Sequence, residues 1–259
     1  MKSSHYPFTD GENEDKFIET LISDMNQVIN DTLHFVQTHR ETEISVSDIP
    51  LDDEESLALI NRGDITGILP MENENMLDLV RKMPTDNTIL LANLIALCVP
   101  YEKYFLDEYL NRECLKTETT YPHPKLKPLL KNTYGLIFFK EDAELTITTL
   151  SGFDKNTALA MVNKMREATY SHEDKELFIQ ACKKVSDIDD SEANSILDKL
   201  QEASQYWASK KTSLELADLC LKQAYLKTHY PLEFLSACMY VEKDMKRLRK
   251  LADDIDLAM

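Results

Sequence analysis

The stretch Tyr121–Phe153, YPHPKLKPLLKNTYGLIFFKEDAELTITTLSGF, decides how the chain is organised. Its beginning is extended, because three prolines before residue 130 remove backbone donors and disfavour helix in the residues that precede them. The apolar run 136–139 is compatible with a short buried strand or with one turn of buried helix, and its periodicity does not distinguish them. From Lys140 to Leu150 polar residues return at helical spacing, and Gly152 is placed to end that helix.

Size and composition indicate a helical protein with its own core. The 259 residues allow one large domain or two small ones. A hydrophobic content of 43% excludes wholesale disorder, and five glycines without alternating β-branched runs favour helices. We therefore predict an all-α fold, with one or two short strands near 136–139 as the only exception. No apolar stretch reaches the roughly 20 residues of a membrane helix.

Amphipathic patterns place most of the helices. The first, 16–38, follows a lead-in at 1–15 that lacks the apolar centre of a secretion signal, and we expect that lead-in to be disordered. The run 87–99 is apolar almost all round, which predicts a buried helix. Arg62-Gly63-Asp64 is interpreted as a helix stop and not as an adhesion motif. Further helices are expected over 53–62, 74–83, 101–111, 154–168, 171–184, 191–206, 213–229 and 232–256. Asp154 is the expected cap of one of these helices, and Ser171 with Asp174 nearly matches a capping box at the start of the next. We divide the chain into 1–15, 16–110, 111–242 and a charged terminal helix, 243–259.

The formal net charge of −17, from 46 acidic and 29 basic residues, is the strongest bulk property. Firm binding to a phosphate backbone needs several Lys or Arg side chains, so an acidic body opposes it unless the bases are segregated. The one dense basic cluster is interpreted as a solvated helix face. It consists of Lys243, Lys246, Arg247, Arg249 and Lys250.

The cysteines and histidines predict neither a disulfide framework nor a metal site. Five widely spaced cysteines suit a reducing compartment, so we expect a cytoplasmic protein. The chain has no Cys-x-x-Cys motif, and His34 and His39 are five residues apart, which misses the i, i+4 face of a helix. No cofactor is expected.

Seven short pieces of sequence resemble the fingers region of the α subunit of bacterial DNA polymerase III, a C-family replicative polymerase. They occur in that family's order and at similar spacing, whereas a single short motif would be weak. The pieces are I-P-L-D-D at 49–53, R-G-D-x-T-G at 62–67, Glu72, L-I-A-L at 94–97 with Pro100, L-K-N-T-Y-G at 130–135 with Glu141, L-x-G-F at 150–153 and Q-A-Y-L-K-T-H-Y-P-L-E-F at 223–234.

The resemblance implies a helical fingers fold and shows what the sequence lacks. The palm's paired aspartates, the phosphoesterase-like domain and the thumb have no counterpart in it. Glu19 is the acid nearest to the position of the remaining palm aspartate. Two-metal nucleotidyl transfer needs carboxylates that hold two cations about 3.5–4 Å apart, and one carboxylate does not provide them.

Several positions depart from the family, mostly where it carries polar or basic residues suited to phosphate. The preserved positions are instead helix starts, turns and core residues, which implies a degenerate relative whose fold outlasted its chemistry. The departing segments are Leu69-Pro70-Met71-Glu72-Asn73, Val99-Pro100-Tyr101-Glu102, Phe139-Lys140-Glu141-Asp142, Val162–Ala168 and Ala208–Thr212.

These points lead to one functional hypothesis and two alternatives. The first is a stand-alone, non-catalytic relative of the fingers region that acts through an unidentified protein partner in DNA replication or repair. The alternatives are a nucleic-acid binder and the fingers part of a split DNA polymerase whose palm lies on another chain. Mg²⁺ would be needed only in the split enzyme, and we do not expect polymerase activity of the isolated chain. No catalytic or metal-binding residue is assigned. The resemblance carries over six residues with a weak expectation of nucleotide or DNA binding: Lys210, Lys211, Arg166, Lys164, Glu72 and Glu141.

Overall fold

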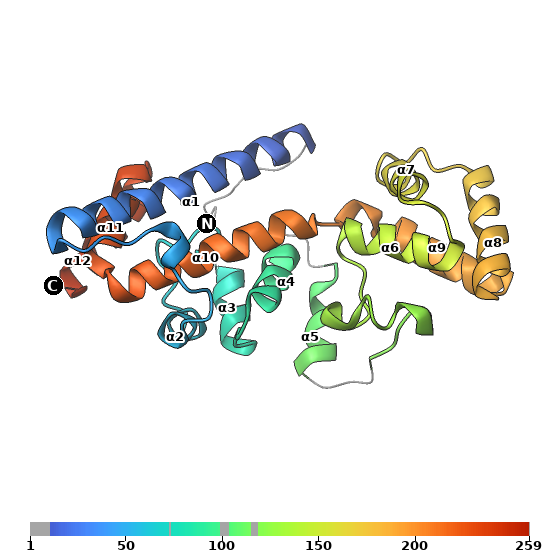
Figure 1. Ribbon diagram of the computed structural model, residues 1–259, viewed down its shortest axis with the longest axis horizontal. Helices are drawn as coiled ribbons and strands as arrows, with labels where there is room; N and C mark the ends of the chain where they lie inside the picture. Colours follow the sequence, from blue (N-terminus) through green and yellow to red (C-terminus); the bar gives the residue numbers. More distant parts are fainter. Residues whose placement is uncertain (1–10, 73, 99–103, 115–118, 259) are drawn as a thin grey trace. The chain divides into compact units, whose positions relative to one another are not determined.

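The computed structural model describes residues 11–258 except 73, 99–103 and 115–118. This part of the chain contains twelve α-helices and four short 3₁₀ helices and no β-strand (Figure 1), which confirms the all-α prediction. It forms two compact units. The first unit comprises the residues up to Ile95 together with those from Leu214, and the second unit comprises Ala96–Ser213. This grouping differs from the contiguous division expected from the sequence, because helices near residues 230–240 pack against the first helix.

The first unit is built around the long helix α1. Helix α11 packs along α1, and α12 packs against α11. The buried side chains of α1 include Met25, Val28 and Ile29, and α11 contributes Phe234 and Leu235. The helices with residues in this unit are α1 (Gly11–Arg40), α2 (Glu54–Asn61), α3 (Glu74–Lys82), α4 (Thr88–Cys98), α10 (Lys210–His229), α11 (Pro231–Val241) and α12 (Met245–Ala258).

Two expectations for this unit have clear outcomes. Helix α4 is buried along most of its length, as predicted for 87–99. The disordered lead-in was predicted too long, since α1 already begins at Gly11. Residues 1–10 of that lead-in lie outside the described residues. The start was misplaced because polar residues carry no periodicity by which a helix is recognised. None of the described helices combines the length and the hydrophobicity that a membrane span requires.

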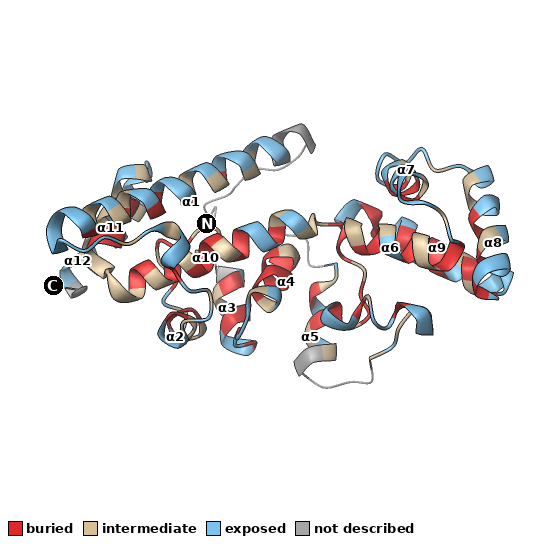
Figure 2. Ribbon diagram, viewed as in Figure 1, coloured by how far each residue is buried: buried red, intermediate tan, exposed pale blue. Residues whose placement is uncertain are grey.

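The second unit packs its helices around α6, which follows the extended segment near residue 137. Helices α7 and α8 contact α6, and α9 contacts α8. Buried side chains lie on the inward faces of these helices (Figure 2), among them Ile147, Phe178 and Leu197. Its elements are α5 (Leu106–Cys114), η2 (Pro124–Leu126), η3 (Lys131–Thr133), α6 (Lys140–Ser151), α7 (Lys155–Arg166), α8 (His172–Ser186), α9 (Asp190–Ala203) and η4 (Ser204–Tyr206).

The predicted helix ends of this unit are confirmed. Asp154 accepts hydrogen bonds from the amides of Asn156 and Thr157 at the start of α7. Ser171 and Asp174 form a capping box at the start of α8. Gly152 ends α6 with a φ of +73°, a conformation that glycine adopts without strain.

The apolar run 136–139 is buried and extended but is not a strand. Phe139 forms a single parallel bridge with Ala208. The amide of Lys140 donates to the Ala208 carbonyl at 3.0 Å, and the amide of Ala208 donates to the Phe138 carbonyl at 2.9 Å. This bridge brings the start of α6 next to the start of α10, which positions part of the candidate site.

Candidate functional site

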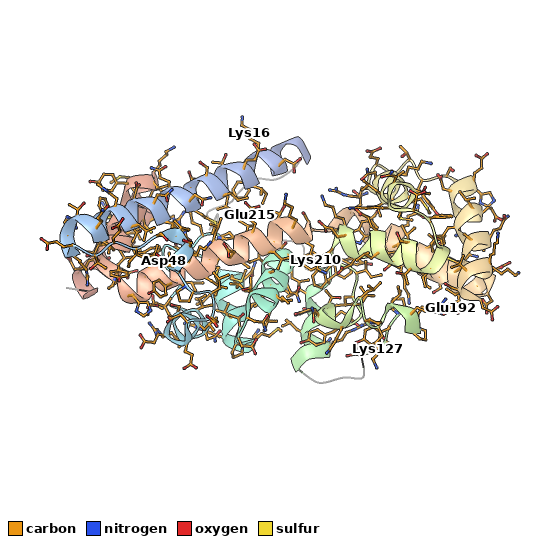
Figure 3. The ribbon with its side chains drawn as sticks, viewed as in Figure 1. Lys16, Asp48, Lys127, Glu192, Lys210 and Glu215 are labelled. Atoms are coloured by element: carbon orange, nitrogen blue, oxygen red, sulfur yellow. The ribbon has the colours of Figure 1, made fainter. Side chains whose placement is uncertain are left out.

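The six residues carried over from the fingers resemblance fall in three separate places. Glu72 follows the turn between α2 and α3 in the first unit. Glu141, Lys210 and Lys211 meet at the start of α10, where Figure 3 labels Lys210. Lys164 and Arg166 lie in the last turn of α7. The chemistry of each place follows from its own contacts.

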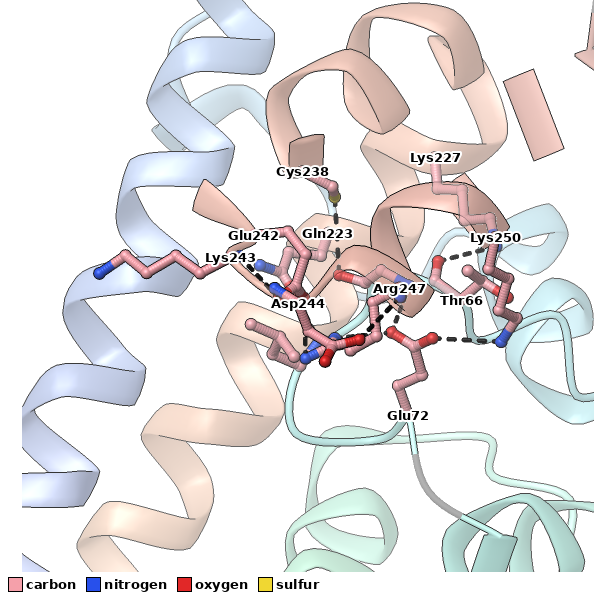
Figure 4. Close-up of polar contacts among 12 residues, drawn as sticks. Thr66, Glu72, Gln223, Lys227, Cys238, Glu242, Lys243, Asp244, Arg247 and Lys250 are labelled. Atoms are coloured by element: carbon pink, nitrogen blue, oxygen red, sulfur yellow. Dashed lines mark hydrogen bonds and ion pairs between the residues drawn. The ribbon is translucent and has the colours of Figure 1, made fainter. Parts of the chain in front are cut away.

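Glu72 receives three donors and is almost enclosed by them (Figure 4). Its Oε2 accepts from the amide of Gly67 at 3.1 Å and from Arg247 at 2.8 Å, and its Oε1 accepts from Lys250 Nζ at 3.1 Å. Burial acts to raise the pKa of Glu72, but the charge of Arg247 and the hydrogen bonds outweigh it and lower this pKa below its usual value. Glu72 is therefore an ionised acid that fastens α12 to the turn.

The same turn is held from α10 by the buried Lys227. Its Nζ donates to Asp64 Oδ1 at 2.6 Å, to the Asp64 carbonyl at 3.0 Å and to the Thr66 carbonyl at 3.0 Å. An ammonium group has three donors, and all three are used here. Burial acts to raise the pKa of Asp64, but its contact with Lys227 lowers it overall. The turn is thus fixed by a charge that water barely reaches.

Further polar groups of α10 and α11 complete the grip on this segment, which we call the 64–72 turn. Gln223 Oε1 accepts from the amide of Leu69 at 3.1 Å, and the thiol of Cys220 donates to the Leu69 carbonyl at 3.1 Å. Gly67 has a φ of +81°, and a Cβ there would lie 3.0 Å from the sulfur of Cys238. Any other residue would be strained at this φ, and its Cβ would press on the side chains of Cys238 and Phe234 in α11.

Sequence reasoning missed Gln223, Lys227 and Arg247 as the residues that fasten the 64–72 turn. Gln223 and Lys227 belong to the Q-A-Y-L-K-T-H-Y-P-L-E-F piece, and both are polar residues close to apolar ones in that helix. A buried polar side chain needs a partner, so this pattern was a usable signal for a contact across the fold. Arg247 belongs to the basic cluster that was interpreted as a solvated face. That interpretation is wrong for Arg247, which is partly buried between two acids.

At the start of α10, Glu141 and Asp142 of α6 hold the helix end. Glu141 Oε2 accepts from the amide of Lys210 at 2.8 Å, and its Oε1 accepts from Ser209 Oγ at 3.2 Å. Lys210 Nζ donates to Asp142 Oδ1 at 2.8 Å. The Asp142 side chain is only 1% exposed. Burial raises the pKa of Asp142 above its usual value, and Lys210 opposes that rise only in part.

The remaining carried-over bases divide into one that is paired and two that face solvent. Lys164 Nζ lies 2.6 Å from Asp174 Oδ1, which belongs to the capping box of α8. Lys211 and Arg166 are exposed, and within the described part of the chain the structure shows no ion pair for either. Lys210 and Lys211 are adjacent in sequence but differ in role, since only Lys211 has its charge available to a ligand.

Two expectations concerned the palm and phosphate positions. Glu19 is exposed on α1. Val99-Pro100-Tyr101-Glu102, which replaces the family's Arg-Pro-Gly-Pro, lies outside the described residues. Within residues 11–258, apart from the three gaps, no group of three or more His, Cys, Asp or Glu side chains could hold a metal ion. Cys98, Cys182, Cys220 and Cys238 are buried, and the last three of these are not in disulfide bonds.

The fold and its contacts define a helical protein of two units, in which one unit holds a glycine-containing turn against three consecutive helices, α10, α11 and α12, that lie far from the turn in sequence. The sequence matches the family model for the bacterial DNA polymerase III alpha subunit finger domain over residues 25–186. This match covers more than half of the 259 residues, so the chain belongs to that finger-domain family.

Curated relatives agree with this assignment. The chain is 28% identical to the DNA polymerase III subunit alpha of Pseudomonas aeruginosa, over 82% of this chain and 19% of the relative. It is 26% identical to the protein of that name from Aquifex aeolicus, over 86% of this chain and 19% of the relative. It is 27% identical to the DNA polymerase III subunit alpha of Escherichia coli K12, over 84% of this chain and 20% of the relative. The chain thus spans about a fifth of the length of the curated relatives it matches.

Proposed function

We propose that this chain is a non-catalytic finger-domain protein that acts as a helical interaction module in DNA replication or repair. The observation that carries the proposal is that most of the carried-over residues make polar contacts within the chain. Such contacts engage the charged groups of four of them: Glu72, Glu141, Lys164 and Lys210. A triphosphate is instead bound by bases and oriented donors that converge on it.

The cost of recruiting Lys210 to a ligand supports this view. If Lys210 turned toward a phosphate, Asp142 would remain buried with neither carboxylate oxygen paired within the described residues. Breaking a buried ion pair on one side typically costs about 3–5 kcal/mol, less where one partner is partly exposed, as Lys210 is. The structural use of Lys210 therefore competes with nucleotide binding.

The partner we propose is a protein in the cytoplasm, and its contact site can be tested directly. A photoreactive amino acid would be placed at Leu177 or at Tyr240, two exposed apolar side chains on different units. We expect irradiation in the native cells to crosslink one of these positions to a replication or repair protein, identified by mass spectrometry. Crosslinks to no such protein from either position would contradict the proposal.

Catalytic and nucleotide-binding roles are tested with the purified chain. Titration calorimetry with a deoxynucleoside triphosphate and Mg²⁺ should show no saturable heat of binding. Saturable binding would contradict the proposal that the chain is non-catalytic. The split-polymerase alternative predicts that adding the chain to a palm-bearing protein raises primer extension above that protein's own rate. We expect no such increase, because Lys164 and Lys210 are paired with acids inside the chain and Lys211 and Arg166 are the two carried-over bases left facing solvent.

Nucleic-acid binding is the second candidate, and the charge distribution favours the second unit for it. The first unit has 27 acidic and 13 basic residues, a balance of −14, whereas the second has 19 acidic and 16 basic residues, a balance of −3. Long-range repulsion of phosphate is therefore concentrated in the first unit. Lys211 and Arg166 are the exposed carried-over bases of the second.

Fluorescence anisotropy with a labelled primer-template at low salt tests this candidate. Binding through Lys211 and Arg166 should weaken in the Lys211→Gln/Arg166→Gln variant and keep its strength in Lys243→Gln/Lys246→Gln, which removes two exposed bases of the first unit. Each lost phosphate contact should reduce the slope of log affinity against log salt by about 0.7–0.9. No anisotropy change with the unaltered chain at tens of micromolar would eliminate this candidate.

A further inference from the structure

Helix α12 has a small apolar anchor and a concentrated ionic one. Over residues 245–256, the part of the helix whose side chains are described, Leu251 is the single fully buried side chain. Asp244 starts the helix by accepting from the amides of Lys246 and Arg247 at 2.9 and 3.0 Å. Leu248 and Ile255 are only partly buried, so the polar contacts of α12 contribute to its position beside these apolar ones.

Those contacts converge on one carboxylate of the 64–72 turn. Arg247 reaches Glu72 at 2.8 Å with Nη2 and Glu242 at 2.9 Å with Nη1, and Lys250 reaches Glu72 at 3.1 Å. Glu242 also accepts from the amides of Lys243 and Asp244. Figure 4 shows this chain of contacts from the α11–α12 junction to Glu72. Two cations of α12 thus share a single acid.

Three more bases of the same segment remain on the surface. Lys243, Lys246 and Arg249 are exposed, within a unit whose balance of charge is otherwise strongly acidic. An approaching polyanion is repelled by most of this unit and attracted to the first half of α12, where these bases are concentrated. Once there, its phosphate oxygens compete with Glu72 for Arg247, because guanidinium binds phosphate in the same two-point geometry as carboxylate.

We propose that α12 is a displaceable strap, and that an anion of the polyphosphate class takes Arg247 and Lys250 from Glu72 and so releases α12 and the 64–72 turn together. The two segments open together because Glu72 links them and also accepts from the amide of Gly67. Lys227 and Gln223 hold the turn from α10 and remain in place, so the turn loosens without the first unit unfolding.

Hydrogen–deuterium exchange of the full chain, with and without inorganic polyphosphate, tests the proposal. We expect exchange in residues 245–256 and 64–71 to rise about tenfold with polyphosphate, which corresponds to about 1.4 kcal/mol. Sodium chloride at equal ionic strength should produce a smaller rise. The helices α1 and α8 should keep their protection, which distinguishes release of the strap from unfolding.

Two matched double variants separate the strap contacts from surface charge. Arg247→Gln/Lys250→Gln should open both segments without polyphosphate and respond no further to it. Lys246→Gln/Arg249→Gln, on the same helix, should remain closed until polyphosphate is added and then need a higher concentration. Unchanged exchange of the original chain in polyphosphate would overturn the proposal, as would opening of α12 while residues 64–71 stay protected.

Discussion

Lys210 and Asp142 form an ion pair of 2.8 Å in which one partner is buried and the other is 35% exposed. The second carboxylate oxygen of Asp142 has no hydrogen-bond partner among the described residues. The pair joins α6 to the first residue of α10, and a basic residue that the family resemblance suggested for phosphate is thereby used for structure. Substitution of Lys210 should therefore affect stability differently from substitution of its neighbour Lys211.

Removing Lys210 should lower the stability of the protein, whereas removing the charge of Asp142 should not. Lys210→Met leaves a buried carboxylate unpaired and should lower the free energy of unfolding by about 2–3 kcal/mol, while Lys211→Met should change it by less than about 0.5 kcal/mol. Urea unfolding followed by the fluorescence of Trp207, the one tryptophan of the chain, reports on this unit. Equal effects of the two substitutions would refute the distinction.

Asp142→Asn should leave stability at neutral pH equal to or higher than that of the original chain. The pKa of Asp142 is raised by burial in the folded protein, so folding favours its neutral form. The destabilisation by the charged form is absent below the unfolded-state pKa and complete above the folded-state pKa. The advantage of asparagine should therefore appear as pH rises through this interval, and a loss of stability at pH 7 would show that the Lys210 pair outweighs burial.

Glu72 predicts a pH dependence of the opposite sign. Its pKa is lowered in the folded protein, so the stability it contributes is present above the unfolded-state value, near 4.5, and is lost as pH falls through the folded-state value. Glu72→Gln should therefore be less stable than the original chain at pH 7, and the difference should shrink on acidification. Thermal unfolding followed by far-UV circular dichroism between pH 7 and pH 3 measures the stability difference between Glu72→Gln and the original chain. If this difference did not change with pH, ionised Glu72 would be excluded as its cause.

Lys227→Met should be among the most damaging single changes in the first unit. The substitution leaves two carbonyls and the Asp64 carboxylate without their donor, at a cost of about 3 kcal/mol. Lys222→Met serves as the control on the same helix, because the ion pair that the described residues show for Lys222 is with Asp218 one turn away, and it should matter by about 0.5 kcal/mol. Denaturant unfolding by circular dichroism gives both values; similar costs would contradict the clamping role.

Gly67→Ala should destabilise the fold by about 1–2 kcal/mol or more, through its positive φ and the approach of Cβ to Cys238 and Phe234. Gly152→Ala tests the contribution of space, since Gly152 also has a positive φ but faces the half-exposed Val185. We expect the Gly67 substitution to cost more in urea titrations. Equal costs at the two glycines would show that the positive φ, and not packing against α11, accounts for the effect.

The sequence by itself determined the all-α fold, the buried helix near residue 92, the caps at Asp154, Ser171 and Gly152, and membership of the finger-domain family. These features depend on periodicity, on residues close together in the chain, or on short motifs, all of which can be recognised without coordinates. The same local signals did not distinguish a strand from a turn of helix at 136–139, where the structure has an extended segment with a single bridge. They also placed the start of the first helix too late.

Only the tertiary structure decided how the charged residues are used. Arg247 is separated from Glu72 by 175 residues, Lys227 from Asp64 by 163 and Lys210 from Asp142 by 68. A basic residue has the same letter whether it faces water, a ligand or a buried acid, because its role is set by the side chains that folding brings within about 4 Å. A local pattern, such as Lys227 among apolar residues, can indicate that a buried partner exists, but only the folded chain shows which residue that partner is.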